Sequence, residues 1–205
     1  MEYLAIVFIL EIFAVIATFV GNNSTMEAKI IMFVLIGGLG VLILSMRIHD
    51  FFIAYVLKKK SFRRAIRMYK SKLRMTPNSR SKNGILINIA PLHFMLDEME
   101  EGKKVLDSID LLTIKLKVLK GYMQLLYAYY YYKIDDVKKA DGFLEAAINY
   151  DELFKFPADL VKSAILLKDN KKDEAAKLFS GIPKDLDDYI EPFDKLFLEV
   201  ESQLK

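Results

Sequence analysis

The residues that could perform chemistry are few and widely spaced. The chain contains no cysteine, which excludes a thiol nucleophile, a disulfide and a thiolate metal site. Its two histidines, His49 and His93, stand far apart and lack the spacing of a zinc motif such as HExxH. The glycine-rich residues 37–40 lack the following Lys and Ser or Thr of a phosphate-binding loop. We therefore expect no enzyme activity, no metal site and no cofactor.

Charge and hydropathy are unevenly distributed along the 205 residues. The net charge of +3 combines about −2 in residues 1–57, +11 in residues 58–82 and −6 in residues 83–205. The mean hydropathy is +0.20 although 28% of the residues are charged. A single evenly mixed domain rarely combines these values, so we expect an apolar membrane segment followed by a smaller domain.

Two apolar runs precede the basic stretch. Residues 3–20 and 30–46 would be about 27 and 25 Å long as helices, close to the thickness of a bilayer core. They predict a transmembrane hairpin over residues 1–46. Glu11 lies within the first run, and a carboxyl at that depth marks a membrane-buried contact, within the hairpin or with a second chain.

The basic stretch predicts the orientation of this hairpin. Short segments rich in Lys and Arg stay on the cytoplasmic side, so both termini are expected in the cytoplasm of a bacterial cell. Beside a membrane, the same side chains would contact anionic lipid headgroups rather than nucleic acid. The predicted headgroup contacts are Lys58, Lys59, Lys60, Arg63, Arg64 and Arg67.

Residues from 51 onward show helical periodicity without a convincing strand, which predicts an all-α domain. A small residue followed four positions later by a large apolar one recurs at intervals of 37, 38 and 35 residues. Twelve residues before each of the last three small residues stands another small residue. The repeated pairs are Ala65 and Tyr69, Gly102 and Leu106, Ala140 and Leu144, and Ala175 and Phe179, with Ala90, Ala128 and Ser163 upstream.

This pattern resembles the tetratricopeptide repeat. The resemblance covers roughly residues 47–183 and implies a solenoid of antiparallel helix pairs over residues 47–188. It also implies a concave groove, lined by the first helix of each pair, that binds a peptide or helix of a partner protein. The groove residues implied in this way are Tyr122, Leu125, Tyr129, Tyr132, Ile87, Phe94, Leu160 and Leu167.

Tyrosines crowd the middle of this predicted groove. Five of the six residues from Tyr127 to Tyr132 are Tyr, so we expect some of them to be exposed and to bind the partner. Tyr127 and Tyr131 are expected on the opposite, packing face. The groove face is also expected to lack a cluster of Lys and Arg.

Residues 189–205 form an amphipathic segment, with Phe193, Leu196, Phe197 and Val200 on one side. We predict a helix that caps the exposed end of the solenoid. The alternative is a helix inserted into the chain's own groove, where it would be autoinhibitory.

The sequence thus predicts a membrane-anchored adaptor or scaffold that recruits a protein partner at the cytoplasmic face of a membrane. The alternative is a small accessory subunit of a membrane enzyme or transporter complex, which would contact that complex through its hairpin.

Overall fold

The computed structural model describes residues 37–38, 48–183 and 192–205. Contacts within the chain define two units, residues 1–54 and residues 55–205, so the division falls a little after the predicted boundary at residue 46. The described residues form helices and turns and contain no strand, which confirms the predicted all-α class.

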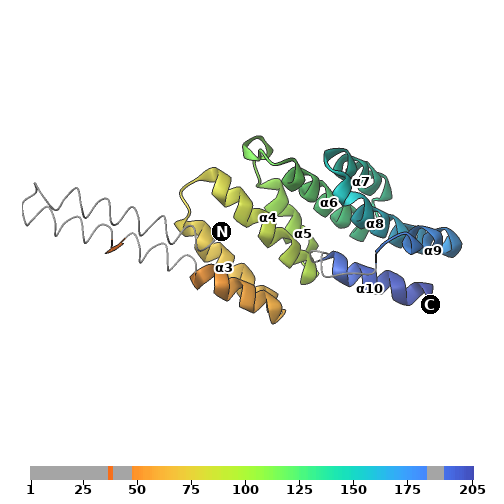
Figure 1. The fold of residues 1–205 in the computed structure, drawn as a ribbon, viewed down its shortest axis with the longest axis horizontal. Coiled ribbons are helices and arrows are strands. Elements are labelled where there is room, and N and C mark those ends of the chain that lie inside the picture. The colour runs from red at the N-terminus through yellow and green to blue at the C-terminus, as the bar shows by residue number, and fades with distance from the viewer. Residues whose placement is uncertain (1–36, 39–47, 184–191) are drawn as a thin grey trace, which may run out of the picture. The chain divides into compact units, whose positions relative to one another are not determined.

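The helices of the second unit follow one another through short turns, with a 3-10 turn before each of α6 and α8 (Figure 1). Their bounds are α3 Phe62–Met75, α4 Ser79–Met95, α5 Met99–Asp107, η1 Leu111–Thr113, α6 Lys117–Lys133, α7 Val137–Tyr150, η2 Glu152–Phe154, α8 Lys155–Lys168, α9 Lys172–Ser180 and α10 Phe193–Leu204.

The lengths and compositions of the described helices contradict the predicted integral-membrane localisation. In the part of the chain that the structure describes, no helix is both long enough and apolar enough to cross a bilayer. The longest, α4 and α6, have 17 residues each and carry charged side chains. The two apolar runs, residues 3–20 and 30–46, and Glu11 lie outside the described residues.

The second unit consists of successive helical hairpins joined by turns of the same geometry. The turns between α4 and α5, α6 and α7, and α8 and α9 contain Asp97, Asp135 and Asn170, each with φ between 58° and 62°. After each of these residues, the next N–H donates a hydrogen bond of 2.9 Å to a carbonyl five positions earlier. Such a bond satisfies a helix-end carbonyl that would otherwise lack a partner.

Lys60, at φ 51°, forms the same turn before α3, where Ser61 donates to the Val56 carbonyl over 3.1 Å. The four left-handed residues are therefore spaced by 37, 38 and 35 positions. These are the intervals of the small-residue pattern in the sequence, so the sequence period coincides with a period in the backbone.

Small residues lie where the two helices of a hairpin pack. Between α4 and α5, Ala90 and Gly102 are both buried, and a Cβ added to Gly102 would lie 3.1 Å from the Ala90 carbonyl oxygen. The corresponding residues of the next two hairpins are also buried, so small side chains permit a close crossing in each case. They are Ala128, Ala140, Ser163 and Ala175.

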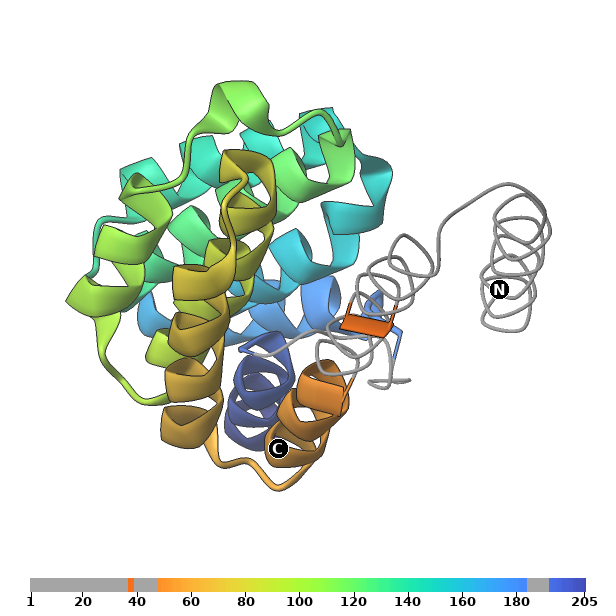
Figure 2. The same ribbon diagram turned by 90° about the vertical axis from the view of Figure 1, so that its left-hand side faces the viewer.

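The larger hydrophobic core of the second unit contains residues from α4 to α10, and a smaller one joins α3 to α4. α6 packs against α7 on one side and against α8 along the row of hairpins. α10 packs on α8 and lies on the opposite side of the row from α7 (Figures 1 and 2).

Candidate helix-binding face

The structure brings the predicted groove residues into one hydrophobic core. Tyr122, Leu125 and Tyr129 of α6 belong to it, as do residues of α4 and α8. These side chains are buried, except Leu167, which is partly buried against the same core. The other buried members of the predicted set are Tyr132, Ile87, Phe94 and Leu160.

The expectation that some of the crowded tyrosines are exposed is wrong. Tyr129, Tyr130 and Tyr132 are at most 7% exposed, and Tyr127 and Tyr131 are partly buried. α10 covers part of α6, through the contacts of Phe193 with Tyr129 and of Glu199 with Lys133.

α10 contacts all three hairpins from α4 to α9. Its Phe193 ring meets Tyr129 of α6 edge-on, with ring centroids 5.6 Å apart. The centroid of its Phe197 ring lies 4.7 Å from that of the Phe179 ring on α9. Its Lys195 reaches to 3.9 Å from Asp97, in the turn after α4. We call the four residues Asp97, Tyr129, Lys133 and Phe179 the α10-binding face.

A helix that only capped the end of the row would contact the last hairpin alone. The contacts with Asp97 and Tyr129 place α10 beside the first and second of these hairpins as well. The alternative interpretation of the C-terminal helix, that it lies in the chain's own groove, therefore agrees better with the structure than end capping does.

The sequence of α10 explains how it binds this face. Phe193, Leu196, Phe197 and Val200 are at most 3% exposed and lie at positions i, i+3, i+4 and i+7, one stripe of a helix. Leu198, on the other side, is 59% exposed. The stripe was recognised from the sequence, and the structure shows what it covers.

Lys133, like Asp97 and Phe179, was not among the predicted groove residues. Its ammonium group lies 3.3 Å from the Glu199 carboxylate of α10. It also lies 5.4 Å from the ring centroids of both Tyr129 and Tyr132, within range of cation–π attraction. A signal was present in the sequence, since Lys133 stands four residues after Tyr129 and shares its side of the helix.

A second lysine lies at the same edge, on a face that was expected to lack a cluster of Lys and Arg. Lys168 of α8 is 4.4 Å from the centroid of the Tyr132 ring and donates to the Tyr132 carbonyl over 3.1 Å. It also pairs with Asp135 in the α6–α7 turn. Tyr132 is thus held by charged groups from two hairpins.

Burial extends to higher pH the range in which the phenols of Tyr129 and Tyr132 stay protonated. Burial raises the pKa of Tyr132 to about 12, and the Glu199 carboxylate contributes to the same shift. Burial also raises the pKa of Tyr129, with Glu199 as the next cause. Both side chains are neutral near pH 7, as a tyrosine of ordinary pKa also is, and present aromatic rings to Lys133 and Phe193.

The other side of α6 packs inside the row of hairpins. Tyr127 and Tyr131 stack on Phe143 of α7, with ring centroids 5.1 and 5.3 Å away, as expected of the packing face. The Tyr127 hydroxyl donates to Asp107 over 3.0 Å, which connects α6 to α5.

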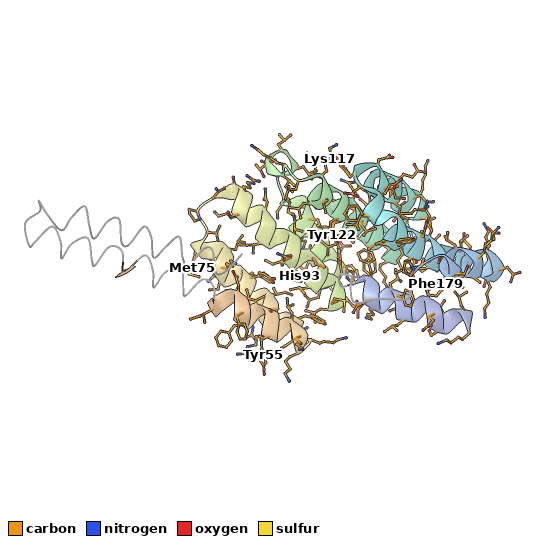
Figure 3. The ribbon with its side chains drawn as sticks, viewed as in Figure 1. Tyr55, Met75, His93, Lys117, Tyr122 and Phe179 are labelled. Atoms are coloured by element: carbon orange, nitrogen blue, oxygen red, sulfur yellow. The ribbon has the colours of Figure 1, made fainter. Side chains whose placement is uncertain are left out.

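His93 and Asp136 have structural partners within the second unit. His93 lies near the end of α4 (Figure 3), and its Nδ1 is 2.7 Å from a carboxylate oxygen of Glu98 across the turn. Asp136 caps α7 by accepting a hydrogen bond from the Lys139 N–H. Within the described ranges, no three acidic or histidine side chains gather as a metal site would require.

The basic residues 58–60 are exposed, as are the three predicted headgroup contacts on α3, Arg63, Arg64 and Arg67. Arg63 lies 3.5 Å from Glu98. Their contact with lipid headgroups was inferred from the membrane topology and stays a prediction.

The chain was compared with known proteins. No family model, curated protein or solved structure matches it.

Proposed function

We propose that residues 55–205 form a protein-binding module, a solenoid resembling tetratricopeptide repeats, that holds an amphipathic helix of a partner protein on its α10-binding face. In this role the chain is an adaptor rather than an enzyme. The observation that supports the proposal is the packing of α10, an amphipathic helix, on this face.

The seating follows the usual pattern of helix-in-groove recognition. In such complexes a few apolar anchors at i, i+3, i+4 and i+7 enter an apolar surface, and aromatic anchors contribute most of the affinity. α10 supplies Phe193, Leu196, Phe197 and Val200 at this spacing. The face supplies Tyr129 and Phe179, two aromatic rings from different hairpins.

The test supplies the helix in trans to a full-length chain whose own helix is weakened. In the released chain, Phe193→Ala and Phe197→Ala remove two anchors of α10 and leave the face intact. A labelled peptide of residues 192–205 is titrated into this chain, and fluorescence anisotropy reports binding. We expect the released chain to bind the peptide at least about tenfold more tightly than the wild-type chain, because truncated anchors no longer compete for the face.

Two controls accompany the titration. A scrambled peptide of the same composition should not bind, and circular dichroism should show that the released chain is folded. A folded released chain that binds no peptide would contradict the proposed function.

A further inference from the structure

We infer that α10 is an internal copy of the partner's binding segment, so that the partner is an amphipathic helix with a carboxylate six residues after its first aromatic anchor. This inference rests on the proposed function and adds the chemistry by which the face selects its ligand. The partner helix carries aromatic residues at i and i+4, aliphatic residues at i+3 and i+7, and Asp or Glu at i+6.

The acidic position follows from how Lys133 is held. Its ammonium group lies near two aromatic rings of α6, and its side chain is only 23% exposed, so its direction is set by α6 itself. From there it reaches Glu199, which is i+6 when Phe193 is i. A partner helix that replaced α10 without this carboxylate would leave the ammonium beside an apolar surface with no opposite charge.

A second charge fixes the direction in which the helix lies. Lys195, at i+2, is near Asp97 in the turn after α4, whereas Glu199 is near Lys133 on α6. A helix bound in the reverse direction would place its acid toward Asp97 and its base toward Lys133. Like charges at both places would disfavour that arrangement, so the two pairs select one orientation.

The occupied face also implies a competition. A helix tethered in the same chain acts at an effective concentration on the order of millimolar. A partner with the same anchors therefore binds weakly until it matches that concentration or presents a better-fitting helix. A helix that shares only some of the anchors of α10 should therefore not displace α10 from the face.

The experiment exchanges the charges of the Lys133–Glu199 pair between chain and peptide. The released chain is prepared with Lys133 and with Lys133→Glu, and the labelled 192–205 peptide with Glu199 and with Glu199→Lys. We expect each mismatched combination to bind about tenfold more weakly than the original pair. The doubly exchanged combination should recover to within about threefold of the original.

A peptide with Leu198→Ala is the matched control, because Leu198 is on the exposed side of α10 and its loss should leave the affinity unchanged. Binding that ignores the charge exchange would overturn the inference and leave the proposed function standing. Absence of binding by any peptide to the folded released chain would instead contradict the proposed function.

If the released chain does not fold, the same exchange is made inside the full chain, without the Phe193 and Phe197 substitutions. Lys133→Glu and Glu199→Lys should each lower the melting temperature, and the double variant should recover most of the loss. Additive losses would overturn the inference. A further outcome concerns dimers of the wild-type chain. If such a dimer separates when the peptide is added, the face binds a second copy of the chain, and the inference about a partner helix is overturned.

Discussion

At the crossing of α4 and α5, Gly102 leaves room for the Phe94 ring. A Cβ at this position would lie 2.3 Å from the nearest ring carbon, and Phe94 is almost fully buried. Gly102→Ala should therefore lower the free energy of unfolding by about 1–3 kcal/mol, because the core must shift to admit one methyl group.

Gly142 is the matched control for this substitution. It lies inside α7 with no atom within 4 Å of an added Cβ. Gly142→Ala should raise the free energy of unfolding by about 0.5–1 kcal/mol, because alanine favours a helix interior. Urea denaturation of both variants measures the two changes, and an equal sign for both would contradict this account of the crossing.

The tyrosines beneath α10 make the protein sensitive to alkali. The pKa of Tyr132 is about 12 in the folded chain against its ordinary value of 10.0. Below pH 10 both folded and unfolded chains keep the proton, so the contribution of Tyr132 is constant. Between pH 10 and 12 the unfolded chain loses the proton while the folded chain keeps it, so the free energy of unfolding should fall as pH rises.

Chemical denaturation at a series of pH values measures this fall, and tyrosinate absorbance follows the ionisation itself without interference from tryptophan, which the chain lacks. Ionisation of all eleven tyrosines near pH 10 in the folded protein would show that the phenols of α6 are not buried.

At the scale of elements, the repeated turn before each second helix carries a left-handed residue. Lys60 adopts φ 51°, which costs a residue with a Cβ about 1 kcal/mol relative to glycine. Lys60→Gly should therefore stabilise the chain by up to about 1 kcal/mol. Lys70→Gly, at an exposed position inside α3, should destabilise it by about the same amount. Thermal denaturation distinguishes the two signs, and destabilisation by Lys60→Gly would contradict the turn geometry.

The positions of these turns and crossings could be predicted from the sequence because they depend on local constraints. Ala90, Gly102 and Ala140 are small because two backbones pass close together, and the loops contain Asp97 and Asp135 because polar residues favour the turn. Because each hairpin needs the same small and polar residues at the same places, these residue types recur at a regular interval in the sequence.

The place of α10 could not be predicted in the same way. An apolar stripe such as Phe193, Leu196, Phe197 and Val200 shows that a helix is buried, but any apolar surface of the chain satisfies it. Its contacts with Tyr129 and Asp97 join residues more than sixty positions apart, and no local pattern records such a pairing. The burial of Tyr129 and Tyr132 was misjudged for the same reason.

At the scale of the whole second unit, the chain is a row of hairpins that carries a bound helix of its own. The hairpins provide aromatic rings and charges from three separate turns and helices, and α10 joins them. A helix that contacts each repeat in turn links the repeats, so we expect α10 to stabilise the row while it occupies the α10-binding face. Under the proposed function, a partner helix of the same chemistry would replace α10 in both roles.

Hydrogen exchange of the α10 amides in the full-length wild-type protein tests this central claim most directly. In the free protein, α10 should be protected together with α6 and α8. An isotopically distinguishable 192–205 peptide is then added at several times the effective concentration of the tethered helix. We expect the α10 amides to lose their protection, because the peptide displaces α10 from the face. The amides of α6 and α8 should stay protected, because the peptide covers them in its place. Continued protection of α10 while the peptide is bound would show that the peptide binds elsewhere, and would contradict the claim that this face is the binding site.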